Sequence, residues 1–228
     1  MLDYPLTQNR SPLWREWPRL ARSGFAIAVF LVCVPVFIEA PLAQYFPVWG
    51  LLATVPWLVA SSLLLRRKAT ALWGDLLLGF TGSWLAGSLY WGWFRSEPLL
   101  HLPIEAIALP LPIYLICRQR WLAGSWFAIG SFLGTAVTDL YFYLTGLIPY
   151  WRNLMRSPAD MAGPILHDTL NLVGTPWGIA WAVVLANLLI AVALWGLRRP
   201  QAYWQAFSGA VLSTILVDVL FLLGAMAS

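Results

Sequence analysis

The hydrophobic positions of the chain fall into seven long runs separated by short polar segments. The runs cover residues 23–43, 46–65, 71–94, 99–116, 121–148, 176–197 and 203–227. Each run has about 18–28 residues, enough for a helix that rises about 1.5 Å per residue to cross roughly 30 Å of hydrocarbon. The runs are continuous and do not alternate over ten-residue stretches as membrane β-strands do. The pattern therefore predicts an all-α, polytopic transmembrane helix bundle.

Composition agrees with a membrane protein. Of the 228 residues, 60% are hydrophobic and 11% are charged, and the mean hydropathy is +0.72. Soluble domains contain about 45–50% apolar and about 25% charged residues. A net charge of +4 would favour a nucleic-acid partner in a soluble protein, but here the arginines flank apolar runs and report topology. We predict the lipid bilayer as partner and no nucleic acid, and the oligomeric state stays open.

Basic residues indicate the side of the membrane on which each loop lies. Of the 14 lysines and arginines, eleven lie in residues 1–22 and in the loops after the second, fourth and sixth runs. The opposite loops carry Arg95, Arg152 and Arg156. For seven spans, this positive-inside bias predicts a cytoplasmic N-terminus and a C-terminus outside. Residues 1–22 then form a basic amphipathic arm on the cytoplasmic side, and residues 23–228 form one transmembrane bundle domain.

Three regions carry further local signals. The run over residues 99–116 contains prolines that kink or break a helix: Pro103, Pro110 and Pro112. Residues 149–175 form a polar outer segment that we expect to hold a short surface helix, with Ser157 before Pro158 as its N-cap signature. The first run is longer than a signal-peptide core and ends without a small-residue cleavage site, so we expect a retained helix.

Four carboxylates lie inside the predicted spans, where a charged group is costly and usually functional. Counted along the helices at about 1.5 Å per residue, all four fall in the outer part of the membrane. They are Glu39, Glu105, Asp139 and Asp218. Asp75, by contrast, lies at the cytoplasmic end of its span. A pattern of the fifth run, Gly134-Thr-x-x-x-Asp139-x-x-Phe142, is echoed in the seventh by Ser213-Thr-x-x-x-Asp218-x-x-Phe221. Each helix thus carries a threonine one turn from an aspartate.

The outer polar residues have two interpretations. In the functional one they serve metal binding, proton transfer or recognition of a polar ligand head. The candidate ligand-binding residues are then Glu39, His101, Glu105, Thr135, Asp139, His167, Asp168, Thr214 and Asp218. In the structural one the acids pair with Arg95, Arg152 and Arg156 or accept hydrogen bonds from nearby hydroxyl groups. No spacing typical of a metal site occurs, and Cys33 and Cys117 are interpreted as small buried hydrophobes.

Small residues and tryptophans give packing predictions. Two ladders with four-residue spacing allow helices to approach closely in lipid: Gly79, Ser83 and Gly87, and Gly130, Gly134 and Thr138. We expect both ladders to pack inside the bundle. Most of the 15 tryptophans lie near span ends, as interfacial belts require. Three lie nearer mid-membrane and either pack against helices or line a groove for a flat apolar ligand: Trp84, Trp126 and Trp181.

Five segments resemble a cyanobacterial membrane family that is catalogued as a domain of unknown function. They are residues 72–80 (LWGDLLLGF), 87–93 (GSLYWGW), 101–106 (HLPIEA), 134–143 (GTAVTDLYFY) and 207–218 (FSGAVLSTILVD). The resemblance covers nearly the whole chain. It implies a photosynthetic host, and so a thylakoid or plasma membrane, and it brings no assigned activity and no known catalytic residue.

A second, partial resemblance covers about 35 residues. Asp75, Gly82-Ser-Trp84 and Leu102-Pro-Ile-Glu105 are similar to the membrane-embedded lycopene cyclases of the heterodimer type, which have an aspartate–tryptophan stretch before a Pro-x-Glu-Glu motif. By that resemblance Glu105 would be the acid that protonates a polyene. The chain departs from the motif at Ala106, where a second glutamate is expected, and no second Pro-x-Glu follows.

The sequence leaves three function classes open. The leading hypothesis is a non-enzymatic accessory or assembly factor of a photosynthetic membrane complex, or a protein that binds a lipophilic cofactor such as a carotenoid, quinone or chlorophyll. It is favoured because no nucleotide motif, metal motif or soluble domain occurs in the sequence. One alternative is a membrane-embedded isoprenoid or carotenoid enzyme with Glu105, Asp139 and Asp218 as acid/base groups. The other is a proton- or cation-coupled transporter that uses the outer acids.

Overall fold

The computed structural model describes residues 17–227, and every regular element within them is helical. The helices are α1 (Trp17–Tyr45), α2 (Pro47–Leu52), α3 (Thr54–Leu65), α4 (Ala71–Leu89), α5 (His101–Glu105), α6 (Pro110–Cys117), α7 (Leu122–Thr145), α8 (Ile148–Arg156), α9 (Ala162–Val173), α10 (Pro176–Leu197) and α11 (Ala202–Ala227). Short 3-10 turns occur at Lys68–Thr70, Pro98–Leu100, Ala106–Ala108 and Ala159–Met161, and a π-helical turn covers Tyr90–Phe94. The predicted all-α polytopic bundle is confirmed.

Within residues 17–227, six segments are long and apolar enough to cross a membrane. They are Ser23–Tyr45, Pro47–Leu65, Pro98–Cys117, Leu122–Thr145, Pro176–Leu197 and Ala202–Ala227. The remaining predicted span corresponds to α4, which carries more polar and small residues. Eleven of its 19 residues are buried, Asp75 and Ser88 among them, because α1, α3 and α7 pack around it. The count of seven spans and their orientation stay predictions.

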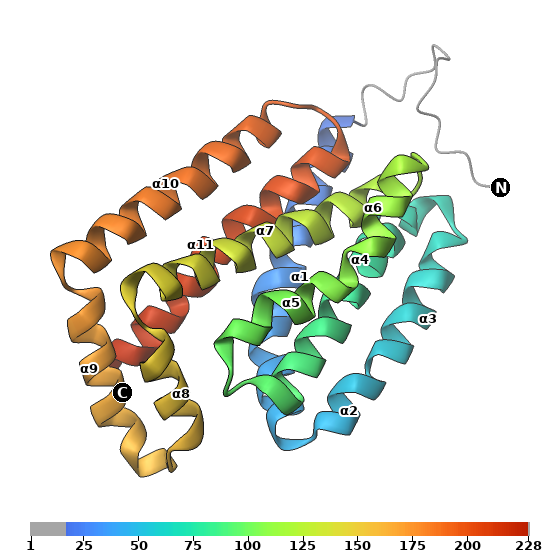
Figure 1. Cartoon of the computed structure of the whole chain (residues 1–228). Coiled ribbons are helices and arrows are strands. Elements are labelled where there is room, and N and C mark those ends of the chain that lie inside the picture. Colours follow the sequence, from blue (N-terminus) through green and yellow to red (C-terminus); the bar gives the residue numbers. More distant parts are fainter. Residues whose placement is uncertain (1–16, 228) are drawn as a thin grey trace.

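The centre of the bundle consists of α1, α4, α7 and α11. Helix α11 packs along both α1 and α7, while α4 packs against α1, α3 and α7 (Figure 1). Helix α10 lies outside α11, and α2 and α3 flank α4. Buried apolar side chains form two clusters, one around Phe80, Trp84 and Phe127 and the other around Leu189 and Phe207. This packing fixes the rotation of each helix and therefore decides which polar side chains face inward.

Glycines allow the central helices to approach closely. A Cβ atom on Gly79 would collide with the backbone of Gly124, and one on Gly134 would collide with the hydroxyl of Thr214. These contacts hold α4 against α7, and α7 against α11, at a distance that a larger residue would not permit. The prediction that the small-residue ladders pack inside the bundle is confirmed.

The chain around the predicted outer segment differs from the expectation. Two helices, α8 and α9, replace the single expected surface helix. The predicted N-cap at Ser157 is wrong, because the Ser157 N–H donates to the carbonyl of Asn153 at 2.9 Å and closes α8. Helix α9 begins only at Ala162. At the other end of the chain α1 already begins at Trp17, so the end of the predicted arm is helical, and its residues 1–16 lie outside the described part.

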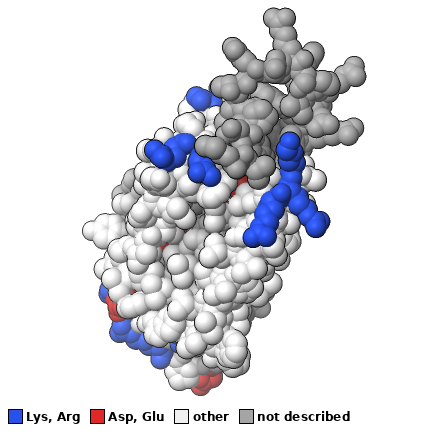
Figure 2. All heavy atoms as spheres, turned by 90° about the vertical axis from the view of Figure 1, so that its right-hand side faces the viewer, with Lys and Arg blue, Asp and Glu red and all other residues white. Residues whose placement is uncertain are grey.

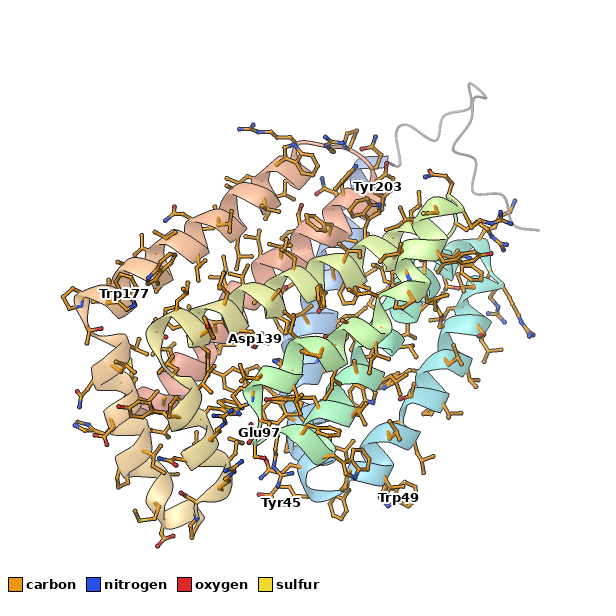
Figure 3. All side chains as sticks on the ribbon, viewed as in Figure 1. Tyr45, Trp49, Glu97, Asp139, Trp177 and Tyr203 are labelled. Carbon is orange, nitrogen blue, oxygen red and sulfur yellow. The ribbon has the colours of Figure 1, made fainter. Side chains whose placement is uncertain are left out.

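Charged side chains lie mainly at the two ends of the bundle. On the face in Figure 2, lysines and arginines gather at both ends, and the surface between is almost uncharged. One end, called the arginine-rich end below, carries Arg66, Arg67, Lys68, Arg118, Arg120, Arg198 and Arg199. Tyr45, Trp49 and Glu97 lie toward the opposite end, whereas Tyr203 lies at the arginine-rich end (Figure 3). An uncharged band between polar ends fits a lipid bilayer.

Candidate functional site

Polar side chains from α1, α4, α5, α7 and α11 meet in the half of the bundle away from the arginine-rich end. We call this set the polar row: Glu39, Ser88, Tyr90, His101, Glu105, Thr138, Asp139 and Asp218. Figure 3 shows the position of Asp139, which lies among the central helices. The row contains five of the nine candidate residues that the sequence singles out. It therefore joins residues that are up to 179 positions apart in the chain.

His101 is the centre of the polar row. Its Nδ1 atom lies 3.0 Å from Oδ1 of Asp139, and its Nε2 atom lies 3.8 Å from Oε1 of Glu105. The ring of Tyr90 stacks on the imidazole with centroids 4.2 Å apart. The second oxygen of Asp139, Oδ2, is buried and has no hydrogen-bond partner in the described part of the chain. One imidazole is thus held between two carboxylates, with acceptor capacity left over on Asp139.

Glu39 forms the inner end of the row. Its side chain is 9% exposed, and Ser88 Oγ donates to Oε1 at 3.0 Å. A Cβ atom on Gly87 would lie only 2.7 Å from the same oxygen, so the carboxylate occupies the space that a glycine leaves open. The glycine ladder of α4 therefore serves the site as well as the packing.

Asp218 forms the other end of the row. Thr138 Oγ1 donates to its Oδ2 atom at 2.9 Å, and Thr138 directly precedes Asp139 on α7. The side chain lies on the exposed side of α11, unlike Glu39. The repeated threonine–aspartate pattern suggested Thr135 and Thr214 as the neighbours of the aspartates. In residues 17–227 neither threonine bonds to an aspartate, and Thr214 instead reaches the Ala210 carbonyl at 3.5 Å.

The backbone that carries His101 and Glu105 is discontinuous. The predicted break in the fourth span is present, since Pro98–Cys117 consists of two 3-10 turns and the short helices α5 and α6. The π-helical turn Tyr90–Phe94 lies next to this broken helix and supplies Tyr90. Such π-turns and broken helices are common at functional sites in membrane proteins. The prolines that interrupt the helix are therefore the local reason for the site's geometry.

The row carries an excess of acidic groups. It contains four carboxylates and one imidazole, and no lysine or arginine within the described residues forms an ion pair with the four acids. In the structural interpretation, the pairing of these acids with Arg95, Arg152 and Arg156 is wrong. Arg95 donates to the Trp91 carbonyl, and the other two arginines bind Glu97, at 2.9 Å for Arg152 Nη2. The hydroxyl donors of that interpretation are present, since Glu39 and Asp218 each accept a hydrogen bond from one. Glu97 lies in the loop before α5 and ties it to α8 at the membrane surface. These ion pairs can form because Glu97 and both arginines lie outside the apolar helices, in the segments that connect them.

Of the four candidate residues outside the row, two lie on a helix that contributes no residue to it. His167 and Asp168 are on α9, and both side chains are exposed. No hydrogen bond or ion pair joins them to the polar row in the part of the chain that the structure describes. Nor does any group of three or more potential ligands among the described residues have the geometry of a metal site. The structure thus gives the polar row, and not α9, as the convergent cluster.

Asp75 has a contact that its sequence position did not reveal. Its two carboxylate oxygens accept hydrogen bonds from the backbone N–H groups of Ala123 at 3.0 Å and Gly124 at 2.9 Å. These are the second and third residues of α7, whose own N-cap, Trp121, has no side-chain oxygen. Asp75 therefore caps α7 from α4, in the way that an aspartate at the N-cap position usually does. This capping role could not be predicted from the sequence, because it depends on the contact between α4 and α7.

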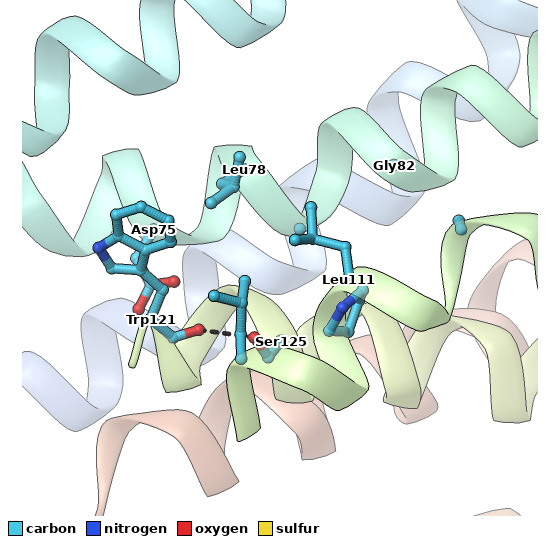
Figure 4. Close-up of a pocket in the computed structure, with 10 residues that line it drawn as sticks. Asp75, Leu78, Gly82, Leu111, Trp121 and Ser125 are labelled. Atoms are coloured by element: carbon cyan, nitrogen blue, oxygen red, sulfur yellow. Dashed lines mark hydrogen bonds between the residues drawn. The ribbon is translucent and has the colours of Figure 1, made fainter. Parts of the chain in front are cut away.

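Two cavities lie toward the arginine-rich end, and no residue of the polar row lines either. One has about 20 Å³, room for about one water molecule, and is lined by Asp75, Gly79 and Ser125 among others (Figure 4). The other is an open depression of about 400 Å³ over Tyr114–Arg120. The mid-membrane tryptophans pack. Trp84 is 2% exposed and donates to the Gly50 carbonyl, Trp126 contacts Trp204 and Phe207, and Trp181 is partly buried against the second apolar cluster.

Fold and site together define a polytopic integral membrane protein, a helix bundle with a convergent polar row inside its apolar band. The chain belongs to the family described as "Protein of unknown function (DUF3120)", whose model matches residues 28–226. The resemblance to a family of unknown function is thereby confirmed. No curated protein and no solved structure matches the chain. The partial similarity to lycopene cyclases therefore gains no support from these comparisons.

Proposed function

We propose that the chain is a proton- or cation-coupled membrane transporter in which the polar row takes up and releases the coupling ion. The observation that carries this proposal is the excess of four carboxylates over one imidazole inside an apolar bundle. Charged groups at membrane depth are costly unless they are neutralised. Because the described arginines and lysines do not pair with these acids, protons or a bound cation must supply the neutralising charge.

The contacts within the row support transfer of a proton between its members. The 3.0 Å bond between Asp139 Oδ1 and His101 Nδ1 permits one proton to move from one atom to the other. The opposite ring nitrogen lies 3.8 Å from Oε1 of Glu105, so a small shift of the imidazole would bring this second acid within hydrogen-bond reach. The unpartnered Oδ2 of Asp139 offers a further acceptor for the incoming ion.

The broken helix supports the same function. Discontinuous helices near ion sites are typical of secondary transporters, because unwound backbone and short half-helices can line a binding site and change shape. Here the two central groups, His101 and Glu105, both lie on the interrupted segment Pro98–Cys117. The described part of the chain offers no comparable observation for the accessory role, a photosynthetic partner, a lipophilic cofactor or an isoprenoid reaction. Those possibilities remain predictions from the sequence.

Ion flux in proteoliposomes tests the proposal. The purified full chain is reconstituted with an internal pH dye or a sodium dye, and an inward gradient of protons or of sodium is imposed. We expect flux of one of these ions above that of empty liposomes, and we expect Asp139→Asn to reduce it to the empty-liposome rate. Asp160→Asn, which changes an exposed acid outside the row, serves as control and should keep the wild-type rate. Equal rates for wild type and empty liposomes under both gradients would overturn the proposal.

A further inference from the structure

Helix α10 presents a polar side chain to the lipid at the middle of the bilayer. Asn187 lies about 16 Å from the start of the helix at Pro176 and about 15 Å from its end at Leu197, at about 1.5 Å per residue. Its Nδ2 group donates to the Val183 carbonyl at 2.7 Å, and the side chain is exposed. Within residues 17–227 its Oδ1 atom accepts no hydrogen bond. A second Nδ2 hydrogen is likewise left over.

An amide that is half satisfied in hydrocarbon is costly. Lipid offers no donor or acceptor, so each unmatched polar group loses the hydrogen bonds it would make with water. Transmembrane helices commonly satisfy such asparagines by hydrogen bonding to another helix. In this bundle α11 and α7 cover the other side of α10, where Leu185, Leu189 and Ala193 are buried. The Oδ1 atom and the second Nδ2 hydrogen of Asn187 can therefore be hydrogen-bonded only by a group outside this chain.

The exposed side of α10 has the spacing of a helix–helix seam. Going along the helix, residues separated alternately by three and four positions are all exposed: Trp177, Ala180, Val184, Asn187, Ala191 and Leu194. This is the a/d pattern of left-handed helix pairs, and the two alanines let a second helix approach closely. In such seams a single asparagine specifies register and the number of helices. Asn187 lies at the centre of this seam.

We propose that two copies of the chain associate in the membrane through α10, with their Asn187 amides hydrogen-bonded to each other. A second copy is the occupant that the chemistry fits best, because its topology places the same amide at the same depth. An amide carries both a donor and an acceptor, so two of them exchange hydrogen bonds across a twofold axis. That axis runs along the membrane normal, and each seam residue then faces its own counterpart. The proposal does not depend on the polar row.

Matched cysteines test the interface in the full chain. Cys33 and Cys117 are first replaced by alanine, and one cysteine is then placed on α10, either in the seam (Ala191→Cys) or on another exposed side (Ala182→Cys). Membranes holding each variant are oxidised and analysed for covalent dimers. We expect efficient dimer formation for Ala191→Cys and none above background for Ala182→Cys. Adding Asn187→Leu to Ala191→Cys should weaken association about tenfold, as loss of an interhelical hydrogen bond does.

Three outcomes would overturn the proposal. The first is equal cross-linking at the two cysteine positions, which would indicate random collision. The second is a seam cross-link that Asn187→Leu leaves unchanged, which would show that the amide does not hold the pair. Counting subunits by photobleaching of singly labelled wild-type protein, diluted in liposomes, gives an independent measure. A monomer at high dilution and at high protein density alike would leave Asn187 to a different partner and would also refute the dimer.

Discussion

Replacing Asp75 with alanine removes the carboxylate that accepts hydrogen bonds from the N–H groups of Ala123 and Gly124. Asp75 is 5% exposed, so water cannot take its place freely. Each buried N–H left without an acceptor costs about 1–3 kcal/mol, and loss of a helix N-cap costs about 0.5–2 kcal/mol. Because these estimates overlap, we expect Asp75→Ala to lower the free energy of unfolding by about 2–4 kcal/mol.

The comparison with Asp75→Asn isolates the cause. Asparagine has nearly the same shape but only one acceptor oxygen, and its NH₂ group opposes the second N–H of α7. Asp75→Asn should therefore lower the free energy of unfolding by about half as much as Asp75→Ala does. The assay is unfolding by SDS in mixed micelles, followed by tryptophan fluorescence. Asp168→Ala is the control, because that side chain is exposed and makes no ion pair in the described part of the chain.

The reasoning fails if Asp75→Ala and Asp168→Ala have the same stability. It also fails if Asp75→Asn is as stable as the wild type, since one acceptor would then suffice. A loss confined to the start of α7, seen as faster hydrogen exchange at Ala123 and Gly124, would support the capping role directly. Exchange that rises evenly over all helices would instead indicate a general packing defect.

Two further predictions concern the polar row and the ion pair between Glu97 and Arg152. Gly87→Ala places a Cβ atom 2.7 Å from Glu39 Oε1 and should displace that carboxylate, which lowers ion flux and the free energy of unfolding. Gly82→Ala on the same helix is the control, because its Cβ atom meets its nearest neighbour at 3.5 Å and should change neither quantity. Equal effects of the two variants would contradict the steric argument. Glu97→Gln removes the charge that holds Arg152, and since the pair is one-third exposed it should cost at most about 1 kcal/mol, while hydrogen exchange in α8 increases. Unchanged exchange in α8 would show that the ion pair does not hold it.

Features that depend only on residues close together in the sequence could be predicted from the sequence. Long apolar runs give spanning helices because hydrocarbon leaves the backbone no other partner than itself. The prolines of the fourth span indicated its interruption, since a proline lacks the N–H that a helix interior needs. The outer clustering of Glu39, Glu105 and Asp139 also follows from counting residues along helices of known rise. These statements need only the chain and the bilayer.

Pairings between helices could not be predicted in the same way. Which face of a helix turns inward depends on packing against its neighbours, so Thr138, and not Thr135, reaches Asp218. Arg152 binds Glu97 because α8 folds back over the loop before α5, a path that the local pattern did not indicate. The capping of α7 by Asp75 likewise requires two helices in contact. Sequence thus determined which segments form long apolar helices and where the polar groups lie along them, while the tertiary structure decided which of those groups meet.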